Sequence, residues 1–128
     1  MAAYTYYATT LSGDKEAEPV LAVEATDRLF HVLGAKPALG RTFREGEDQP
    51  GREPVVVISH ALWRRRYGGD GTVVGCNVDV GGKPHTIIGI MAPSFRFPND
   101  LPNGTNLIPI DAWIAGKQET GSRRARQP

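Results

Sequence analysis

Two side chains of a hydrolytic type stand next to each other in this sequence, in the pair Ser59-His60. A serine nucleophile needs a histidine base within hydrogen-bonding reach, and the sharp turn that presents such a serine is flanked by glycines. Segment 57–61 contains no glycine, and adjacent side chains on a helix point about 100° apart. We therefore interpret Ser59 as the first residue of a helix, where its hydroxyl accepts a hydrogen bond from a free backbone amide.

The residue types that bind transition metals are present but widely separated. His31, His60 and His85 form no HxxH or HExxH pattern, and Cys76 has no second cysteine with which to form a disulfide or a metal site. The acidic residues in segment 45–48 could bind a cation, but the glycines and prolines around them are typical of a solvated loop. We expect no metal and no cofactor.

A phosphate-binding loop and a nucleic-acid surface are both poorly supported. Gly81-Gly82-Lys83 resembles the end of a phosphate loop, but Asn77 replaces the first glycine of that motif and Pro84 replaces its Ser or Thr. The glycines are typical of a hairpin turn. Arg64–Arg66 are consecutive, so on a helix they spread around the axis and form no stripe. We expect no nucleic-acid partner.

Composition is that of one ordinary globular domain. The 128 residues are 40% hydrophobic and 23% charged, and 15 Lys and Arg against 14 Asp and Glu leave a net charge of +1. No charge imbalance indicates an anionic partner. The longest apolar stretch, around 86–92, is far shorter than a bilayer span, and segment 1–12 has no basic leader. We expect neither a signal peptide nor direct membrane insertion by this chain.

The N-terminal third predicts a hairpin, a helix and a loop. Segments 4–11 and 19–25 are β-prone and separated by turn residues. Thr26 is expected to cap a short helix that buries Leu29 and Leu33 on one face and ends at Gly34. The many glycines and prolines between residues 36 and 52 predict a long ordered loop.

The middle of the chain predicts a buried strand, a helix and a second hairpin. Residues 55–58 are continuously apolar and β-branched, which favours a central strand. A helix over 59–67 should place Trp63 and Tyr67 on one buried face, with Trp63 as the core anchor, and end at Gly68. Residues 77–80 and 85–91 predict a hairpin around the two glycines at 81 and 82.

The last part of the chain carries weaker signals. Four prolines make segment 92–109 extended, so that Phe95 and Phe97 can point to one side. Residues 111–114 predict a last edge strand, and the polar segment 117–128 predicts a disordered tail after a domain over 1–116. Together these elements predict an α+β fold, a mixed sheet with β-hairpins and two short helices packed on it.

Six short motifs, in order, resemble the MacB-like periplasmic core domain of ABC transporter permeases. The similarity extends over about residues 20–114 and is closest to a permease type with duplicated FtsX-like halves that is found in acidobacteria and their relatives. The motifs are FHVLG (30–34), PALGRTF (37–43), VVVIS (55–59), LWRRRYGGD (62–70), VG (74–75) and IGIMAPSFRFP (88–98).

The resemblance implies a non-catalytic domain on the periplasmic side of the bacterial inner membrane. Its expected partners are the transmembrane helices of the permease and a separate or fused ATP-binding subunit, and its expected role is to couple ATP-driven movement to efflux or other extracytoplasmic events. A free-standing binding or interaction domain and a non-functional truncated fragment are the alternatives. The family contributes only fold-defining positions, which are Gly34, Gly40, Phe43, Trp63, Tyr67, Gly68, Phe95 and Phe97.

Overall fold

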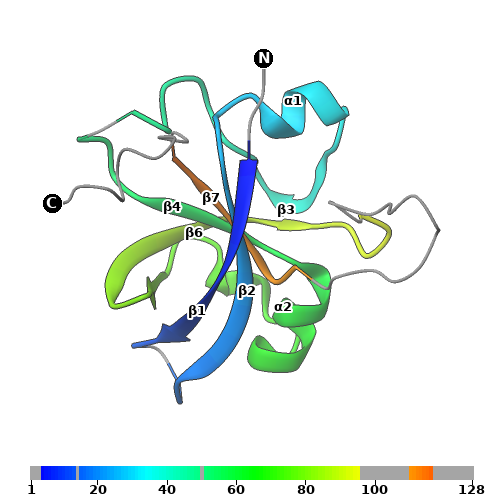
Figure 1. Cartoon of the computed structure of the whole chain (residues 1–128). Coiled ribbons are helices and arrows are strands. Elements are labelled where there is room, and N and C mark those ends of the chain that lie inside the picture. Colours follow the sequence, from blue (N-terminus) through cyan, green and yellow to red (C-terminus); the bar gives the residue numbers. More distant parts are fainter. Residues whose placement is uncertain (1–3, 14, 50, 96–109, 117–128) are drawn as a thin grey trace, which may run out of the picture.

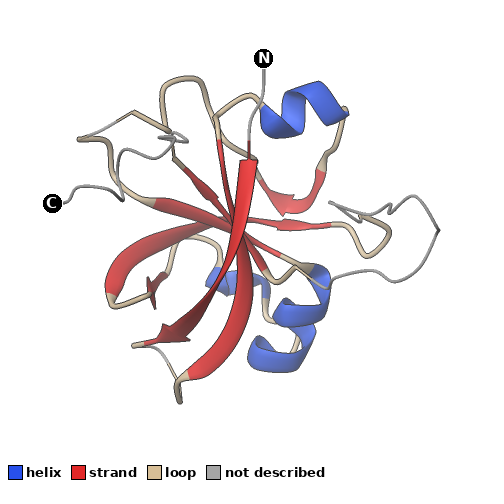
Figure 2. Ribbon diagram, in the orientation of Figure 1, coloured by secondary structure: helices blue, strands red, loops and turns tan. Residues whose placement is uncertain are grey.

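Seven strands, two α-helices and one 3-10 turn make up the parts of the chain that the computed structural model describes, namely residues 4–13, 15–49, 51–95 and 110–116 (Figures 1 and 2). This arrangement confirms the predicted α+β fold with a mixed sheet and two short helices. In chain order the elements are β1 (Tyr4–Ser12), β2 (Glu18–Ala25), α1 (Leu29–Leu33), β3 (Pro37–Gly40), β4 (Val55–Ile58), α2 (His60–Tyr67), η1 (Gly71–Val73), β5 (Asn77–Val80), β6 (Lys83–Met91) and β7 (Ala112–Ala115).

The sheet closes on itself into a small barrel. Its strands are ordered β3-β6-β4-β7-β2-β1-β5, and β5 also pairs with β6, so the described strands form the ring β6-β4-β7-β2-β1-β5. Strand β6 is long enough to bind two neighbours on one edge. Its first half pairs with β5, from Asn77↔Thr86 to Val80↔Lys83, and its second half pairs with β3. Both predicted hairpins, β1–β2 and β5–β6, are confirmed.

Strand β4 lies at the centre of the sheet, as its sequence predicts. All four of its residues are buried, and it pairs in parallel with β6 and antiparallel with β7. Strand β7, by contrast, is no edge strand, and that expectation is wrong. It lies between β4 and β2, and its residues Ala112, Trp113 and Ile114 are all buried. A strand that is covered on both faces is apolar at successive positions, and residues 112–115 (AWIA) are all apolar.

Alternating side chains divide the apolar residues between two cores. On β4, Val56 and Ile58 point into the barrel, whereas Val55 and Val57 point outward under α1. A bulge in the pairing of β4 with β6 restores this alternation, because it lets Ile87 and Ile90, three residues apart, both face inward. The inner core is completed by residues of η1 and α2, and the outer core contains an aromatic cluster.

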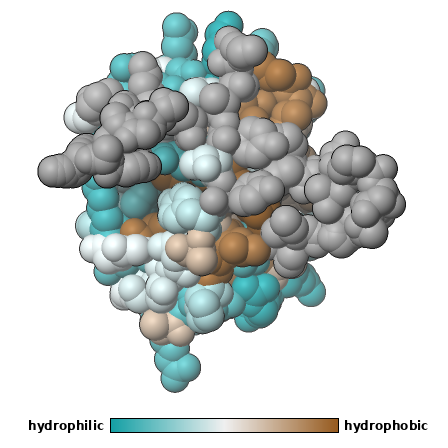
Figure 3. All heavy atoms as spheres, in the orientation of Figure 1, coloured by the Kyte–Doolittle hydropathy of each residue, from teal (hydrophilic) through white to brown (hydrophobic). Residues whose placement is uncertain are grey.

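Helix α1 is shorter and turned differently from the prediction. It begins after Arg28, with no side-chain cap, so Thr26 is not its N-cap. Leu29 and Phe30 are its buried residues, while 40% of Leu33 is exposed, and Figure 3 shows apolar surface over α1. Five residues make little more than one turn, and the large ring of Phe30 fits the outer core better than Leu33, which lies beside the C-cap.

The expected long loop after α1 contains a strand. Strand β3 pairs antiparallel with β6, and it tolerates Pro37 because a strand at the edge of a sheet needs no hydrogen-bond donor on its free side. Gly40 has a φ of +73°, and a Cβ there would lie 2.2 Å from the carbonyl oxygen of Ile88. Residues 36–52 are therefore two structures, a short edge strand and an ordered loop.

Helix α2 begins as predicted but buries a different face. The Ser59 hydroxyl accepts a hydrogen bond from the Leu62 amide at 3.0 Å, which confirms the N-cap. The buried residues of the helix are Leu62 and Arg66, whereas Trp63 is only partly buried and donates from Nε1 to the carbonyl of Asp70 at 2.9 Å. The expectation that Trp63 is the core anchor is therefore wrong. The anchor is Leu62, which enters the inner core at the end of the barrel.

Candidate functional site

The two ends of the barrel differ. Helix α2 follows the end of β4 directly (Figure 1). Leu62 on this helix belongs to the inner core, so that end is closed. At the opposite end β1, β4 and β6 begin and β2, β5 and β7 finish, as their parallel and antiparallel pairings require. A cavity of about 500 Å³ lies there, and we call it the mouth. Its polar lining includes Tyr7, Glu24, Asp48, Arg52, Lys83 and His85.

Burial affects the two aromatic acid–base groups of the mouth. Burial, together with the nearby negative charge of Glu24, raises the pKa of Tyr7 to about 12, so the phenol keeps its proton. Burial also lowers the pKa of His85, whose residue is only 7% exposed. Nδ1 of His85 lies 2.8 Å from the carbonyl oxygen of Lys83, so a proton on Nδ1 donates to that oxygen. The mouth therefore presents a neutral phenol and a predominantly neutral imidazole at ordinary pH.

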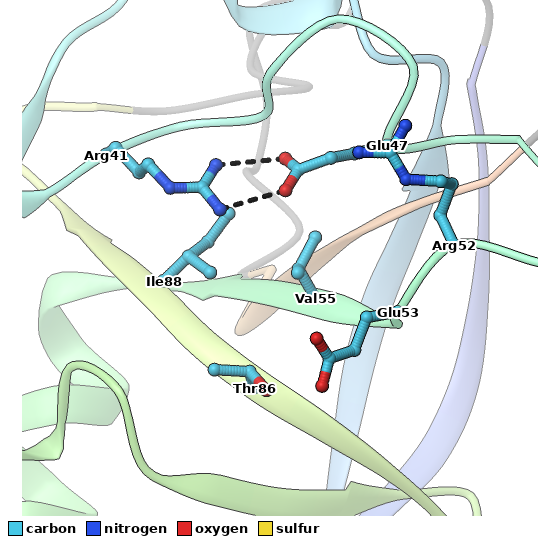
Figure 4. A pocket seen from close by; sticks show the side chains of 7 residues that line it. All are labelled: Arg41, Glu47, Arg52, Glu53, Val55, Thr86 and Ile88. Carbon is cyan, nitrogen blue, oxygen red and sulfur yellow. Dashed lines mark hydrogen bonds and ion pairs between the residues drawn. The ribbon is translucent and has the colours of Figure 1, made fainter.

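One wall of the mouth is the ordered loop between β3 and β4. Arg41 donates two hydrogen bonds to the carboxylate of Glu47, at 3.0 and 2.8 Å, and this pair borders a second cavity of about 230 Å³ (Figure 4). Burial alone would raise the pKa of Glu47, but the hydrogen bonds from Arg41 and the Arg44 amide hold it below its usual value. Two charge-assisted bonds in fixed geometry keep this loop in one conformation.

The same loop is attached to the start of α1 through reciprocal backbone contacts. The carboxylate of Asp27 accepts from the Gly46 amide at 2.6 Å, and the carboxylate of Asp48 accepts from the Asp27 amide at 2.9 Å. The acidic segment 45–48 thus contributes two carboxylates, those of Glu47 and Asp48, to internal bonds. Its role here is to shape the wall of the mouth.

The cations of the mouth are not neutralised in the same way. Within the described residues, neither Lys83 nor Arg52 has an ion-pair partner. Arg52 donates one hydrogen bond, 3.4 Å long, from Nη1 to the carbonyl oxygen of Gly46. They lie on neighbouring strands, since Arg52 closely precedes β4 and Lys83 begins β6. Arg52 and Lys83 therefore lie on the β4–β6 side of the mouth, next to the loop that carries Asp48, whereas Glu24 on β2 lies on the other side.

Ser59 and His60, which the sequence offered as a possible hydrolytic pair, cap and pack a helix in the structure. Ser59 caps α2, and the ring of His60 packs edge-on against Trp63 with centroids 5.2 Å apart. Within residues 4–13, 15–49, 51–95 and 110–116 no three His, Cys, Asp or Glu side chains are grouped closely enough to hold a metal ion. Gly81 and Gly82, with φ of +62° and +86°, form the turn between β5 and β6.

The glycines proposed as fold-defining lie at turns and close approaches. Gly34 and Gly68 are the C-caps of α1 and α2, both in the left-handed conformation with φ of +66° and +64°. Side chains strongly disfavour this conformation, so each glycine ends its helix at low cost. Gly40 permits the close approach of β3 to β6 described above.

The aromatic positions proposed as fold-defining divide into two groups. Phe43 and Phe95 belong to the outer core, where they pack around Phe30, with centroid distances of 5.1 and 5.8 Å. Trp63 and Tyr67 are partly buried at the edge of the inner core. Phe97 lies outside the described residues.

Sequence reasoning missed Trp113, the largest fully buried side chain. Its ring contacts Phe30 and Phe95, with centroids 6.1 and 5.3 Å away, and thereby joins β7 to α1 and to the segment after β6. Its Nε1 is buried and has no hydrogen-bond partner in the part of the chain that the structure describes. The continuous apolar run around it, typical of a central strand, was the available signal.

An ion network that joins three elements was also missed. Glu18 at the start of β2 accepts from Arg65 Nη2 at 2.6 Å and from Arg66 Nη1 at 3.1 Å, and the Arg66 side chain is only 3% exposed. Arg65 also lies 3.5 Å from Asp111, just before β7. These partners are 47 and 46 residues from Arg65 in sequence, so the pattern of arginines on the helix could not reveal them.

The fold resembles that of three solved domains, of which one is described as extracellular and one as periplasmic. The extracellular domain of the noncanonic ABC-type transporter YknZ from Gram-positive bacteria matches with a TM-score of 0.67 and 16% identity, over 89% of this chain and 52% of that one. The periplasmic region of MacB from Actinobacillus actinomycetemcomitans matches with a TM-score of 0.61 and 18% identity, over 98% and 61%. A domain of a permease protein from Porphyromonas gingivalis gives 0.57 and 19%, over 90% and 45%.

The sequence itself identifies the family. The MacB-like periplasmic core domain family matches residues 1–126, and the chain therefore belongs to it. The comparison with curated proteins gives no match. The chain spans 45% to 61% of the length of the three solved domains. Among the described helices none combines the length and the apolar character needed to cross a membrane.

Proposed function

We propose that this chain is a non-catalytic extracytoplasmic module of an ABC-type permease, which couples ATP-driven movement of the transmembrane helices to efflux or to another event outside the membrane. The observation that carries the proposal is the family match over residues 1–126. A domain with this fold occurs in YknZ, which is described as a noncanonic ABC-type transporter. The proposed partners are the permease helices and the ATP-binding subunit.

The architecture supports a role as a rigid body. The ring of strands is filled on the inside and covered on the outside by a second core, so bending the sheet would open both. Arg65 and Arg66 attach α2 to Glu18 on β2, and Arg65 also pairs with Asp111 just before β7. Arg41 fixes the loop at the mouth. A body of this kind transmits a displacement from one surface to another instead of absorbing it.

The absence of chemistry in this module is part of the proposal. Ser59 and His60 are occupied in capping α2 and in packing on Trp63. A double variant Ser59→Ala, His60→Ala should therefore leave transport by the permease unchanged, apart from the stability lost with the cap. Loss of transport at full expression and folding would point to a catalytic role.

The coupling role is tested in a permease that contains this chain, reconstituted with its ATP-binding subunit in vesicles. Replacing the chain by a flexible Gly-Ser linker should leave ATP hydrolysis measurable while abolishing transport. A matched control carries Arg64→Gln, an exposed substitution on α2, and should behave as the parent. Unchanged transport by the linker variant would contradict the proposal.

A free-standing binding domain is the second candidate, and the cavity at the mouth is the observation that favours it. The two candidates differ in genetic context. Permease helices or an ATP-binding subunit encoded next to this chain support the transporter module. Neighbouring genes without either would support the binding domain.

A further inference from the structure

We propose that the mouth of the barrel binds a small organic anion, with a carboxylate or phosphate group held by Arg52 and Lys83. The open ends of small β-barrels are frequent ligand sites, and a cavity of about 500 Å³ is within the size range of such sites. This inference does not depend on the transporter role, because it concerns only the residues that line the cavity.

The sign of the ligand charge follows from the partners of the lining groups. The carboxylates of Glu47 and Asp48 are already engaged, by Arg41 and by the Asp27 amide. Lys83 and Arg52 have no carboxylate partner among the described residues. Asp48 keeps its negative charge on the loop wall, since only neutral donors bind it within the described ranges. Arg52 and Lys83 nevertheless keep N–H donors available on the β4–β6 side of the cavity, where an anion gains charge-assisted hydrogen bonds.

Neighbouring groups determine the shape and the second contact of the ligand. Val80 and Ile114, both members of the inner core, line the cavity and offer an apolar surface to a short carbon skeleton. Tyr7 stays protonated and can donate from its hydroxyl across the cavity. Glu24, on the Tyr7 side, repels a second negative charge there. A monoanion whose far end accepts a hydrogen bond, such as a short hydroxy or keto acid, fits these groups best.

The experiment is a titration of the whole ¹⁵N-labelled chain, followed by amide NMR shifts. The probes are lactate and inorganic phosphate as anions and ethylammonium as a cation. Lactate or phosphate should produce saturable shifts at Gly81, Gly82 and Lys83 and around Arg52, with α1 unaffected. Saturation by phosphate alone identifies a phosphate site, saturation by lactate a carboxylate site, and either outcome supports an anion site.

Three variants make the test specific. Lys83→Gln and Arg52→Gln should each weaken anion binding about tenfold or more, since a hydrogen bond to a charged group contributes roughly 1.5–3 kcal/mol. Arg64→Gln removes an exposed positive charge from α2 at the closed end and should leave binding unchanged. All three substitutions are on exposed side chains, and an unchanged spectrum away from the mouth verifies folding.

Three results would overturn the proposal. The first is the absence of saturable shifts with either anion up to the millimolar range. The second is equal weakening by Arg64→Gln, which would indicate attraction by overall charge instead of a site. The third is tighter binding of ethylammonium than of lactate, which would show that Glu24, and not Arg52 and Lys83, governs the cavity.

Discussion

Leu62 closes one end of the barrel, and its truncation tests how α2 is oriented. The side chain is fully buried and belongs to the inner core, whereas its neighbour Trp63 is only partly buried at the edge of that core. Leu62→Ala removes three carbon atoms and leaves a cavity where the helix meets the barrel. Substitutions of this type cost about 3–5 kcal/mol of unfolding free energy, and we expect about 3 kcal/mol here.

The companion variant is Trp63→Ala. The loss should be smaller, about 2 kcal/mol, because Trp63 is only partly buried at the edge of the inner core and part of its surface already contacts water in the folded chain. This loss includes the hydrogen bond from Nε1 to Asp70, 2.9 Å long. The loss of unfolding free energy should therefore be larger for Leu62→Ala than for Trp63→Ala, which is the opposite of what the spacing of aromatic residues on the helix predicts.

Urea denaturation followed by far-ultraviolet circular dichroism measures both losses. Arg64→Ala on the exposed side of α2 is the control for helix propensity and should change stability by less than about 0.5 kcal/mol. Leu62→Met, which nearly conserves volume, should cost less than about 1.5 kcal/mol and shows that the position tolerates substitution. A larger loss for Trp63→Ala than for Leu62→Ala, or a loss below about 1 kcal/mol for Leu62→Ala, would refute this orientation of the helix.

Two further predictions concern a close approach and the response to pH. Gly40→Ala should lower the unfolding free energy by more than about 1 kcal/mol in the same denaturation assay. The reason is that φ at Gly40 is +73° and the new Cβ would lie 2.2 Å from the Ile88 carbonyl oxygen. Gly51→Ala is the control and should cost less, because its φ is also positive but no atom lies close to the new Cβ. Burial would raise the pKa of Glu18, but hydrogen bonds from Arg65 and Arg66 outweigh it and lower the pKa below its usual 4.5. Glu18 therefore stabilises the fold above pH 4.5, and this stabilisation is lost as pH falls through the lowered pKa. Glu18→Gln should be less stable than the parent at pH 7, with the difference disappearing in acid; a difference that persists unchanged at pH 2 would contradict the ion network.

Local signals predicted the elements well. The β-branched run of β4, the serine cap and glycine stop of α2, and the two glycines between β5 and β6 each depend on interactions within a few residues. The order of short motifs predicted the family, which the match over residues 1–126 confirms. The predicted positions were wrong where they depend on contacts between residues far apart in the sequence. The sequence predicts β7 as an edge strand, because its neighbours β2 and β4 are far away in sequence and no local pattern reveals them.

The candidate site could not be predicted at all from the sequence. Tyr7, Arg52 and Lys83 come from three separate segments, and only the closure of the barrel brings them to one cavity. Each is an ordinary surface residue when considered alone. No spacing rule connects them, because strand pairing and not chain distance determines which strand ends meet.

The sequence by itself determined the mixed α+β class, most of the elements and the family, because hydrophobic period, capping and turn residues act locally. Only the tertiary structure decided that β5 pairs with both β1 and β6, which turns a sheet into a barrel. It also decided that Leu62 and not Trp63 fills the closed end, and that Arg52 and Lys83 share the open one. The physical reason is that burial and charge pairing depend on the final positions of residues distant in the chain, which no local pattern encodes.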